Sequence, residues 1–462
     1  MGIIYLVFYS ISILTILVTS QKTYLIVEIF QKLLQVKQTN AYRLSKEKNI
    51  DRAYLSKLFS GTIAKPGEDK LAKVARALKI EPKQLQSIFD NPELAIQELS
   101  LENIELNLNL PQIKSKHDLG TAPDGTICYQ RKYEIEKIQH LVKLDCCRVL
   151  TIFGMGGIGK TTLTMEVVRQ LKAEFDYILW RNLSNIFLPE IVIQDALRLF
   201  AQKKIKVGIN RQIADLLQYL REHRCLLILD EVETVLATGN SLEIYQHGYQ
   251  IYGELFKQIA QAQHQSCLVL VSNEKPRDIS ILESYSASVH SLQLQGSTTV
   301  CYEILKDKGM IQTPAWDELI EAYHEHPLAI KIVGDMIKEL FDGDVAEFLR
   351  QNTLFLGDLE FILHEQYYRL SDAEKYVINI IAQMNKPLSL QELSEQYATQ
   401  LGCSAIINCL NNLKRRSLIE IVACSKSFQK DFTSFSTTRD AKNKISFYTI
   451  QPIVRKYITS QT

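Results

Sequence analysis

Residues 154–161 contain four glycines, a lysine and a threonine in the order Gly-Met-Gly-Gly-Ile-Gly-Lys-Thr. An apolar run precedes them and a helical pattern follows, which is the context of the phosphate-binding P-loop. Glycines let the backbone turn so that several N–H groups point at phosphate oxygens. The motif therefore predicts a site for ATP or ADP, made by Gly154, Met155, Gly156, Gly157, Ile158, Gly159, Lys160, Thr161 and Thr162.

A pair of acids follows the apolar run Cys225–Leu229. An apolar strand that ends in a carboxylate supplies the Mg²⁺ side of a P-loop site. We expect Thr161 and Asp230 to hold Mg²⁺, and Lys160 to place its charge at the β- and γ-phosphates. Glu231 is the candidate for polarising an attacking water, with an exposed acid at a strand end as the alternative. The candidate catalytic residues are thus Lys160, Asp230 and Glu231, in an ATPase that is at most weak.

Further candidates lie at the ends of other predicted elements. Glu233 is a second candidate for polarising the water. Asn273 follows the apolar run Cys267–Val271, where a polar residue can sense the γ-phosphate. Pro327 starts a helical pattern, and proline there can pack on adenine, with a simple helix start as the alternative.

The segment 39–61 has the spacing of a helix-turn-helix, with apolar positions every three or four residues. We expect Arg52, Ser56 and Lys57 on the exposed face of the second helix, where phosphates or base edges of duplex DNA are read. Residues 22–89 hold 14 Lys and Arg against 6 Asp and Glu, whereas the whole chain has a net charge of +1. The alternative is a small helical module of the same shape that binds a protein partner.

The elements that position these residues alternate between strand and helix from about Cys128 onward, which predicts a parallel sheet covered on both faces. Helices then dominate, and the last part has three helical runs followed by two strand-like runs, the outline of a winged helix. The predicted fold class is multidomain, α/β plus α. Its parts are a hydrophobic segment (1–22), a helix-turn-helix-like domain (24–89), a linker (90–127), a P-loop NTPase domain (128–296), a helical domain (297–356) and a winged-helix domain (357–462).

Residues 3–18 are apolar or neutral throughout. Two interpretations stay open: a membrane anchor, or residues added by a mis-called start codon. Positive charge begins at Lys22, which would leave the rest of an anchored chain in the cytoplasm. The nine cysteines form no C-x-x-C pair, which favours reduced thiols in the cytoplasm and no metal site besides that for Mg²⁺.

Several segments together resemble the NB-ARC ATPases of the STAND class of signalling switches, most closely those of cyanobacteria, which often precede a WD-repeat propeller. The resemblance covers 128–458 and rests on G-M-G-G-I-G-K-T-T-L at 154–163, R-C-L-L-I-L-D-E-V-E at 224–233, S-N-E-K-P-R-D at 272–278 and H-P-L-A-I-K-I-V at 326–333. Residues 39–85 are similar to phage-repressor-type helix-turn-helix domains.

The resemblance implies a cycle in which ADP holds the chain closed, ATP opens it, opened chains self-associate, and slow hydrolysis resets it. By similarity, Arg131 lies near the nucleotide, Pro327 packs on adenine and Gln451 contacts the ADP phosphates. The chain departs from the family at Asn273, where arginine is usual, and at Gln451, where relatives outside this branch carry histidine.

The sequence ends at Thr462, just after the winged-helix pattern, which we interpret as a reduced member, a truncated gene or a chain whose sensor is a separate partner. Three functions are ranked from these patterns: a nucleotide-controlled switch with residues 24–89 as its output, then a nucleotide-stabilised protein-interaction scaffold, then a true turnover ATPase.

Overall fold

The computed structural model describes residues 117–461 with gaps at 121, 124–127, 144, 186–187, 202–207, 240–242, 385, 398–400 and 424–445. Nearer the N-terminus it describes 50–59, 66–91 and the single positions 26, 29, 30, 33, 34, 37, 44, 63 and 95. The chain divides into two compact units, Met1–Ile113 and Lys114–Thr462. The apolar segment 3–18 lies outside the described residues, and no helix among those described is long and apolar enough to cross a membrane.

In the described part of the first unit, both ends are defined for three helices: α3 (Arg52–Phe59), α4 (Glu68–Leu78) and α5 (Pro82–Asp90). Asp51 begins α3, because its Oδ1 accepts a hydrogen bond from the backbone N–H of Tyr54 at 2.6 Å, the geometry of an N-cap. The predicted DNA-reading residues Arg52, Ser56 and Lys57 all lie in α3. Lys57 is exposed, and the side chains of the other two are outside the described set. The helix-turn-helix assignment stays a prediction.

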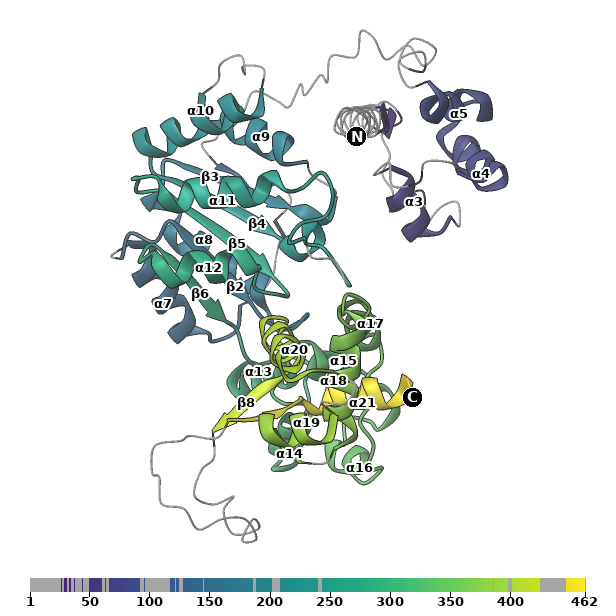
Figure 1. Ribbon diagram of the computed structural model, residues 1–462. Helices are drawn as coiled ribbons and strands as arrows, with labels where there is room; N and C mark the ends of the chain where they lie inside the picture. Colours follow the sequence, from purple (N-terminus) through teal and green to yellow (C-terminus); the bar gives the residue numbers. More distant parts are fainter. Residues whose placement is uncertain are drawn as a thin grey trace. The chain divides into compact units, whose positions relative to one another are not determined.

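The second unit is built on a six-stranded sheet whose neighbouring strands are all parallel (Figure 1). The strand order is β1-β3-β4-β5-β2-β6. Strands buried on both faces in such sheets are continuous apolar runs, and β2, β4 and β5 are buried at every position. The strands are β1 (His117–Asp118), β2 (Val149–Phe153), β3 (Tyr177–Asn182), β4 (Cys225–Asp230), β5 (Cys267–Ser272) and β6 (Val289–Gln293).

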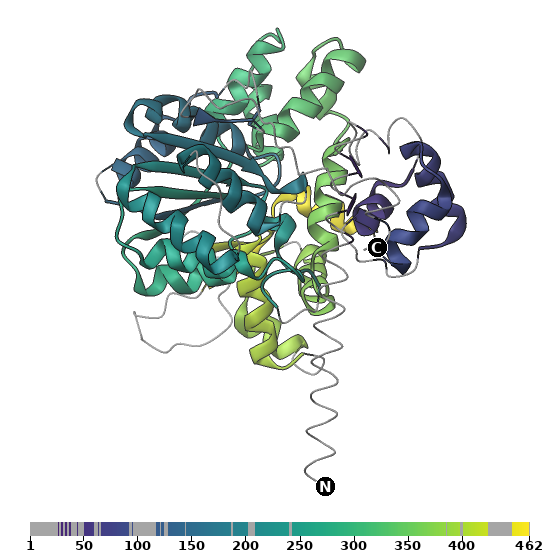
Figure 2. The same ribbon diagram turned by 90° about the horizontal axis from the view of Figure 1, so that it is seen from above.

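Helices cover both faces of this sheet, as the two views show (Figures 1 and 2). On one face, α7 and α8 share an apolar core with alternate residues of the strands. Helices α9 to α12 form the other layer. The bounds are α7 (Lys132–Lys143), α8 (Lys160–Leu171), α9 (Pro189–Ala201), α10 (Ile209–Glu222), α11 (Ile251–Gln261) and α12 (Arg277–Tyr285). The parallel α/β sheet predicted from the sequence is confirmed.

The edge strand β1 lies inside the stretch predicted to be a linker. His117 and Asp118 pair with Ile178 and Leu179 of β3. An ion pair between Arg181 and Asp118, at 2.6 Å, holds this two-residue strand in place. The sequence analysis missed this strand, because two residues are too few to show the alternation of apolar and polar positions that indicates a strand.

The rest of the unit is mostly helical and shares one apolar core. It begins with α13 (Thr298–Asp307), α14 (Ala315–Ala322), α15 (Pro327–Leu340) and α16 (Val345–Leu349). It continues with α17 (Leu359–Tyr368), α18 (Asp372–Gln383), α19 (Leu390–Tyr397), α20 (Cys403–Arg415) and α21 (Pro452–Gln461). A small antiparallel sheet has the order β7-β9-β8, with β7 (Leu388–Ser389), β8 (Glu420–Ala423) and β9 (Ser446–Thr449). The winged-helix assignment of 357–462 stays a prediction.

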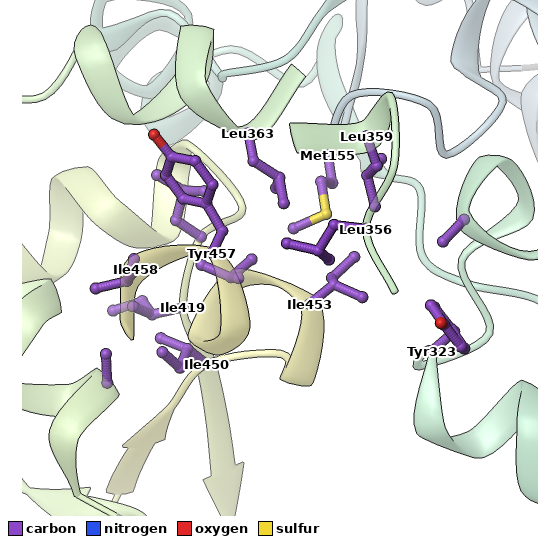
Figure 3. Packing of buried hydrophobic residues seen from close by; sticks show 14 of the residues in the cluster. Met155, Tyr323, Leu356, Leu359, Leu363, Ile419, Ile450, Ile453, Tyr457 and Ile458 are labelled. Atoms are coloured by element: carbon purple, nitrogen blue, oxygen red, sulfur yellow. The ribbon is translucent and has the colours of Figure 1, made fainter. Parts of the chain in front are cut away.

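One member of that core comes from the P-loop. Met155 is buried among the helices that follow the sheet, near Leu359 and Leu363 of α17 (Figure 3). The phosphate-binding motif is therefore packed directly against the C-terminal half of the unit.

Candidate nucleotide-binding site

The P-loop lies between the carboxyl end of β2 and the N-terminus of α8. Strand β2 stands between β5 and β6 while the chain continues into β3, further along the sheet, so the loop occupies the kind of switch point where α/β sheets bind ligands. The first N–H groups of α8 have no partner within the helix and point toward the loop. Gly157 and Gly159 have φ angles of 81° and 101°, which side chains with a Cβ adopt only with strain.

Glycine is also required at two other positions, because neighbouring atoms leave no room there for a Cβ. A Cβ on Gly154 would lie 2.5 Å from the carbonyl oxygen of Leu294, and one on Gly156 would overlap Ile362 of α17. The loop is thus enclosed by β6 on one side and by the C-terminal helices on another.

Lys160 is almost fully buried, with 8% of its surface exposed. Its Nζ donates to the carbonyl oxygens of Gly154 at 3.0 Å and Met155 at 2.9 Å, and to Oδ1 of Asn273 at 2.8 Å. Burial lowers the pKa of Lys160 to about 8, against the nearby carboxylates, which raise it. The ammonium is therefore held over the loop, where it can meet phosphate oxygens.

The predicted Mg²⁺ residues lie together. Thr161 Oγ1 donates to Asp230 Oδ1 at 3.2 Å. Burial, together with the negative charges of Glu231 and Glu233, raises the pKa of Asp230 to about 7. Hydroxyl and carboxylate oxygens suit Mg²⁺, and a cation would favour the ionised form of this crowded carboxylate, so the donor set fits the ion. Apart from this hydroxyl–carboxylate pair, the described residues include no cluster of three or more His, Cys, Asp or Glu side chains arranged to hold a metal.

The two glutamates after Asp230 differ in their surroundings. Glu231 is half-buried, has a φ of 56°, and its Oε1 accepts from Asn182 Nδ2 at 3.1 Å. Glu233 is buried, and its Oε2 accepts from the backbone N–H of Asn273 at 3.0 Å. Burial raises the pKa of Glu233, opposed by the charge of Lys160. Glu231 is accordingly the more accessible acid, while Glu233 holds the end of β5.

A cavity of about 280 Å³ adjoins the P-loop on its other side. The predicted residues Arg131, Gly157, Ile158, Gly159, Thr162 and Pro327 line it, and its remaining walls come from Cys128, Tyr129, Val300, Ile304, Asp307, Lys308, Leu328 and Lys331. Apolar walls with a few polar groups at one end are typical of small-molecule sites. A nucleoside whose phosphates were bound in the P-loop would fit this position.

Arg131 reaches this cavity from the segment before α7. Its guanidinium donates to the carbonyl oxygens of Gln295 at 3.0 Å and Ile158 at 3.1 Å, and it pairs with Glu134 at 3.0 Å. It thereby ties the P-loop to the end of β6 while lining the cavity. Tyr129 donates to the carboxylate of Asp307 across the rim.

His326 was not among the predicted site residues. It is fully buried, its Nδ1 accepts from the N–H of Ala329 at 3.2 Å, and its Nε2 therefore donates to the carbonyl oxygen of Gly156 at 3.0 Å. Burial lowers its pKa to about 4, so it is neutral near pH 7. The signal in the sequence was its place before Pro327 at a helix start, which suggests a cap and not a contact with the P-loop.

Gln451 lies in a different cluster. Its Nε2 donates to Glu420 Oε1 at 2.9 Å, and the same oxygen lies 2.8 Å from His324 Nε2. The structure thus brings together the P-loop, Asp230, Glu231, Asn273, Arg131 and Pro327, and it places Gln451 on Glu420.

A family model of the NB-ARC domain matches residues 131–244, from Arg131 through the P-loop to beyond Glu233. The chain contains an NB-ARC domain. Its nucleotide-binding character is therefore supported both by the geometry of the P-loop and by this match.

Relatives extend the similarity beyond the NB-ARC domain. A WD repeat-containing protein of Nostoc sp. is 34% identical over 320 residues, which cover 66% of this chain and 25% of that protein. A disease resistance protein of Arabidopsis thaliana is 25% identical over 328 residues, which cover 64% of this chain and 26% of that protein. The chain spans about a quarter of the length of these curated relatives.

Among solved structures, a Signal Transduction ATPase with Numerous Domains from Pyrococcus horikoshii, which has a tetratricopeptide repeat sensor, covers 75% of this chain and 44% of its own. The identity is 14% and the TM-score 0.37. A TM-score this low supports no functional conclusion.

Proposed function

We propose that this protein is a nucleotide-controlled signalling switch that binds ATP or ADP with Mg²⁺ in its NB-ARC domain. One observation carries the proposal: the phosphate-binding loop is packed against helices α15 and α17 as well as against its own sheet. A ligand in that loop therefore affects how the C-terminal helices are held. A ligand shifts a conformational equilibrium only if it binds the two states differently, and a site shared by two parts of the chain meets that condition.

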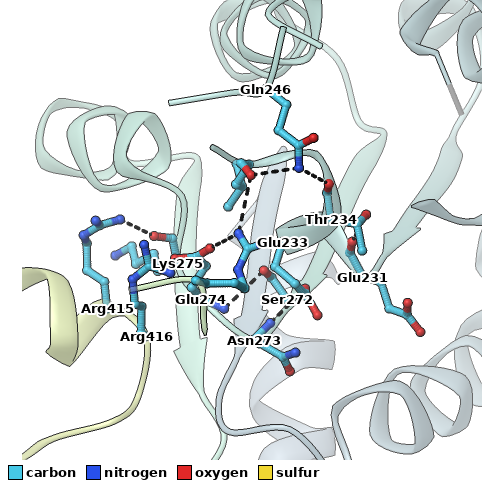
Figure 4. A network of polar contacts seen from close by, with 12 residues as sticks. Glu231, Glu233, Thr234, Gln246, Ser272, Asn273, Glu274, Lys275, Arg415 and Arg416 are labelled. Carbon is cyan, nitrogen blue, oxygen red and sulfur yellow. Dashed lines mark hydrogen bonds and ion pairs between the residues drawn. The ribbon is translucent and has the colours of Figure 1, made fainter. Parts of the chain in front are cut away.

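A polar network beside the loop supports the same coupling (Figure 4). Glu274, directly after Asn273, is buried and accepts from Arg369 at 2.5 Å and Arg416 at 2.9 Å. Both arginines belong to the C-terminal part, which the chain reaches through α17. Asn273 contacts Lys160 and Glu274 contacts these arginines, so adjacent residues connect the P-loop lysine with the C-terminal helices.

The proposed cycle follows the family that the sequence resembles. ADP holds the NB-ARC domain and the helices after it closed, ATP opens them, opened chains self-associate, and slow hydrolysis by way of Glu231 resets the switch. The proposed cycle also requires a sensor partner and a signal that activates the switch.

The test compares the size of the full chain in two nucleotide states. Size-exclusion chromatography with light scattering, in Mg²⁺ with ADP or with a non-hydrolysable ATP analogue, should give a larger radius or a higher mass with the analogue. Lys160→Ala should remove the difference. Nucleotide binding with identical radius and mass in both states would contradict the switch and favour a nucleotide-stabilised scaffold.

For the output we propose that residues 24–89 bind duplex DNA. The support is that the described residues of this segment include six exposed basic side chains, on or directly after its helices: Lys57, Lys70, Lys73, Arg76, Lys79 and Lys83. Binding through phosphates weakens steeply with salt. Fluorescence anisotropy with a mixed-sequence duplex should therefore show binding that is lost between low and high salt. Absence of binding at low salt would instead favour a protein partner for this module.

A further inference from the structure

The imidazole of His326 joins the N-terminus of α15 to the P-loop, and its side chain is fully buried. Its Nδ1 accepts from the N–H of Ala329 at 3.2 Å, as the cap of α15, and its Nε2 donates to the carbonyl oxygen of Gly156 at 3.0 Å. A neutral imidazole has one acceptor and one donor nitrogen. The ring therefore uses its whole hydrogen-bonding capacity on the helix start and the loop.

A strained turn brings the ring to this place. His324 and Glu325 have φ angles of 51° and 56°, in the left-handed region that residues with a Cβ rarely adopt. The carbonyl oxygen of Glu325 accepts from the N–H of Ser297 at 2.9 Å, which ties the turn to the segment between β6 and α13. Strain of this kind persists only where the surrounding structure holds it. The turn thus fixes the direction in which His326 enters α15.

The oxygen that His326 holds belongs to the peptide between Gly156 and Gly157. Glycine has no Cβ, so a peptide between two glycines can turn over at little conformational cost. The C=O and N–H of a trans peptide point in opposite directions, and none of the described peptide bonds is cis. The bond from His326 therefore selects one orientation of this peptide, in which the N–H of Gly157 points away from the imidazole.

The N–H of Gly157 is available to a ligand in this orientation. No described residue accepts it, and Gly157 lines the cavity beside the loop. P-loops bind phosphates through backbone N–H groups of this kind. In the opposite orientation the loop would present the carbonyl oxygen of Gly156 to the phosphate, and the negative charges on the two oxygens would repel each other.

From this geometry we infer that His326 is a positioning residue of the nucleotide site, which holds the peptide between Gly156 and Gly157 so that the N–H of Gly157 donates to a phosphate oxygen. The inference rests on the proposed function, because it needs a nucleotide in the P-loop. Pro327, the next residue, lines the nucleoside cavity. The start of α15 therefore acts on the phosphates through His326 and meets the nucleoside through Pro327.

Two substitutions of His326 separate its two hydrogen bonds. Asparagine is a strong N-cap, and its Oδ1 can replace Nδ1 as the acceptor for the N–H of Ala329, but its side chain is too short to reach Gly156. Glutamine is longer and can place an N–H₂ group near the position of Nε2, but it is not among the residues that cap helices well.

The test uses the full chain, stripped of nucleotide, as wild type, His326→Asn and His326→Gln. His247→Asn, at an exposed histidine, is the matched control. Isothermal titration with ADP and with a non-hydrolysable ATP analogue, both in Mg²⁺, measures the affinities. Thermal melts without nucleotide measure the stabilities. If the asparagine variant does not fold, His326→Ser replaces it, because serine also caps helices.

We expect His326→Asn to weaken the binding of both nucleotides by about tenfold or more, the effect of losing one well-placed hydrogen bond to a charged group. His326→Gln should bind more tightly than His326→Asn and yet melt at a lower temperature, because it keeps the bond to the loop and loses the cap. His247→Asn should match the wild type in both quantities. A merely structural role would not give this opposite order of affinity and stability.

The other outcomes separate the two proposals. Unchanged affinity in His326→Asn, or affinities that follow the melting temperatures so that His326→Gln is the weaker binder, would overturn the inference and leave the proposed function intact. A wild type that binds neither nucleotide would overturn both.

Discussion

At the scale of residues, the site is a small buried cluster of opposite charges. Lys160 lies near Asp230, Glu231 and Glu233, and the shifts in pKa show that burial opposes the charge on both sides. Bound phosphates would favour the charged form of the lysine, and bound Mg²⁺ would favour the charged form of the carboxylates. The predictions at this scale concern the state of the carboxylates.

Asp230→Asn is expected to stabilise the nucleotide-free protein most at about pH 8 and clearly less at about pH 5. Burial and two neighbouring carboxylates raise the pKa of Asp230 from 3.8 to about 7. The folded protein holds this group neutral below about pH 7, whereas the unfolded chain stays ionised down to about pH 4. The cost of the buried charge is therefore complete above about pH 7, shrinks as the pH falls, and is absent only below about pH 4.

That cost is up to about 4 kcal/mol for a shift of about three units. Thermal melts of both proteins at the two pH values measure it. An equal change in melting temperature at both pH values would contradict the assignment. The same variant should lose the gain in nucleotide affinity that Mg²⁺ gives the wild type.

The two glutamates should separate in a hydrolysis assay. Glu231→Gln is expected to lower single-turnover ATP hydrolysis by about a hundredfold with little change in stability, because a positioned base contributes about that much and this side chain is half-buried. Glu233→Leu should instead lower stability, because the backbone N–H of Asn273 would lose the Oε2 that accepts it. Unchanged hydrolysis in Glu231→Gln would remove this residue from the catalytic set.

Among the elements, the loop 273–275 after β5 connects the sheet with the C-terminal helices. Lys275 and Arg415 are joined by two hydrogen bonds. The backbone N–H of Lys275 donates to the carbonyl oxygen of Arg415 at 2.9 Å, and the side-chain Nη1 of Arg415 donates to the carbonyl oxygen of Lys275 at 2.7 Å. Glu274 adds its two ion pairs beside them (Figure 4). We therefore expect a substitution in this loop to affect the C-terminal helices as well as the sheet.

Glu274→Ala should destabilise the protein by about 3–5 kcal/mol, the cost of leaving buried partners unpaired. Arg369 and Arg416 would each lose their carboxylate. Hydrogen exchange should then speed up in α17 and α20 more than in α10. Glu365→Ala, at an exposed position of α17, is the matched control and should change neither quantity. Uniform exchange across the unit in Glu274→Ala would contradict a localised connection.

A second connection depends on pH. His324, in the turn before α15, lies 2.8 Å from Glu420 of β8. The hydrogen bond to Glu420 raises the pKa of His324, with added effects of the charges of Glu420 and Glu325, while burial opposes the rise. A group with a raised folded pKa adds stability that is complete below its unfolded value and is lost as the pH rises through the folded value.

We therefore expect His324→Gln to lower the melting temperature at about pH 5.5 and to leave it unchanged at about pH 9, since the unfolded pKa of histidine is about 6.5. The facing groups are Glu420, Glu325, His326 and Gln451, and of these His326 stays neutral because burial lowers its pKa. A larger drop in melting temperature at the higher pH would contradict this predicted direction of the pH dependence.

The elements also show what the sequence could predict. The P-loop, the end of β4 and the parallel sheet follow from local patterns, because continuous apolar strands and a glycine turn leave clear signals. The two-residue strand β1, the contact of His326 with Gly156 and the packing of Ile362 on Gly156 join residues far apart in the chain. Such contacts depend on tertiary packing, and they leave no periodic pattern of residues in a single sequence.

In the molecule as a whole, the proposed nucleotide site is shared between the NB-ARC domain and the helices after it. Lys160, Asp230 and the cavity belong to the site, and α17 covers the P-loop tip. The basic helices of the first unit form the proposed output.

Binding of a nucleotide in this P-loop is tested by the nucleotide content of the purified chain from Tyr24 onward. The protein is denatured, and the released nucleotide is identified by chromatography, beside Lys160→Ala treated in the same way. We expect near-stoichiometric ADP from the wild type and none from the variant. A wild type that is empty and takes up neither ATP nor ADP when these are added with Mg²⁺ would contradict it.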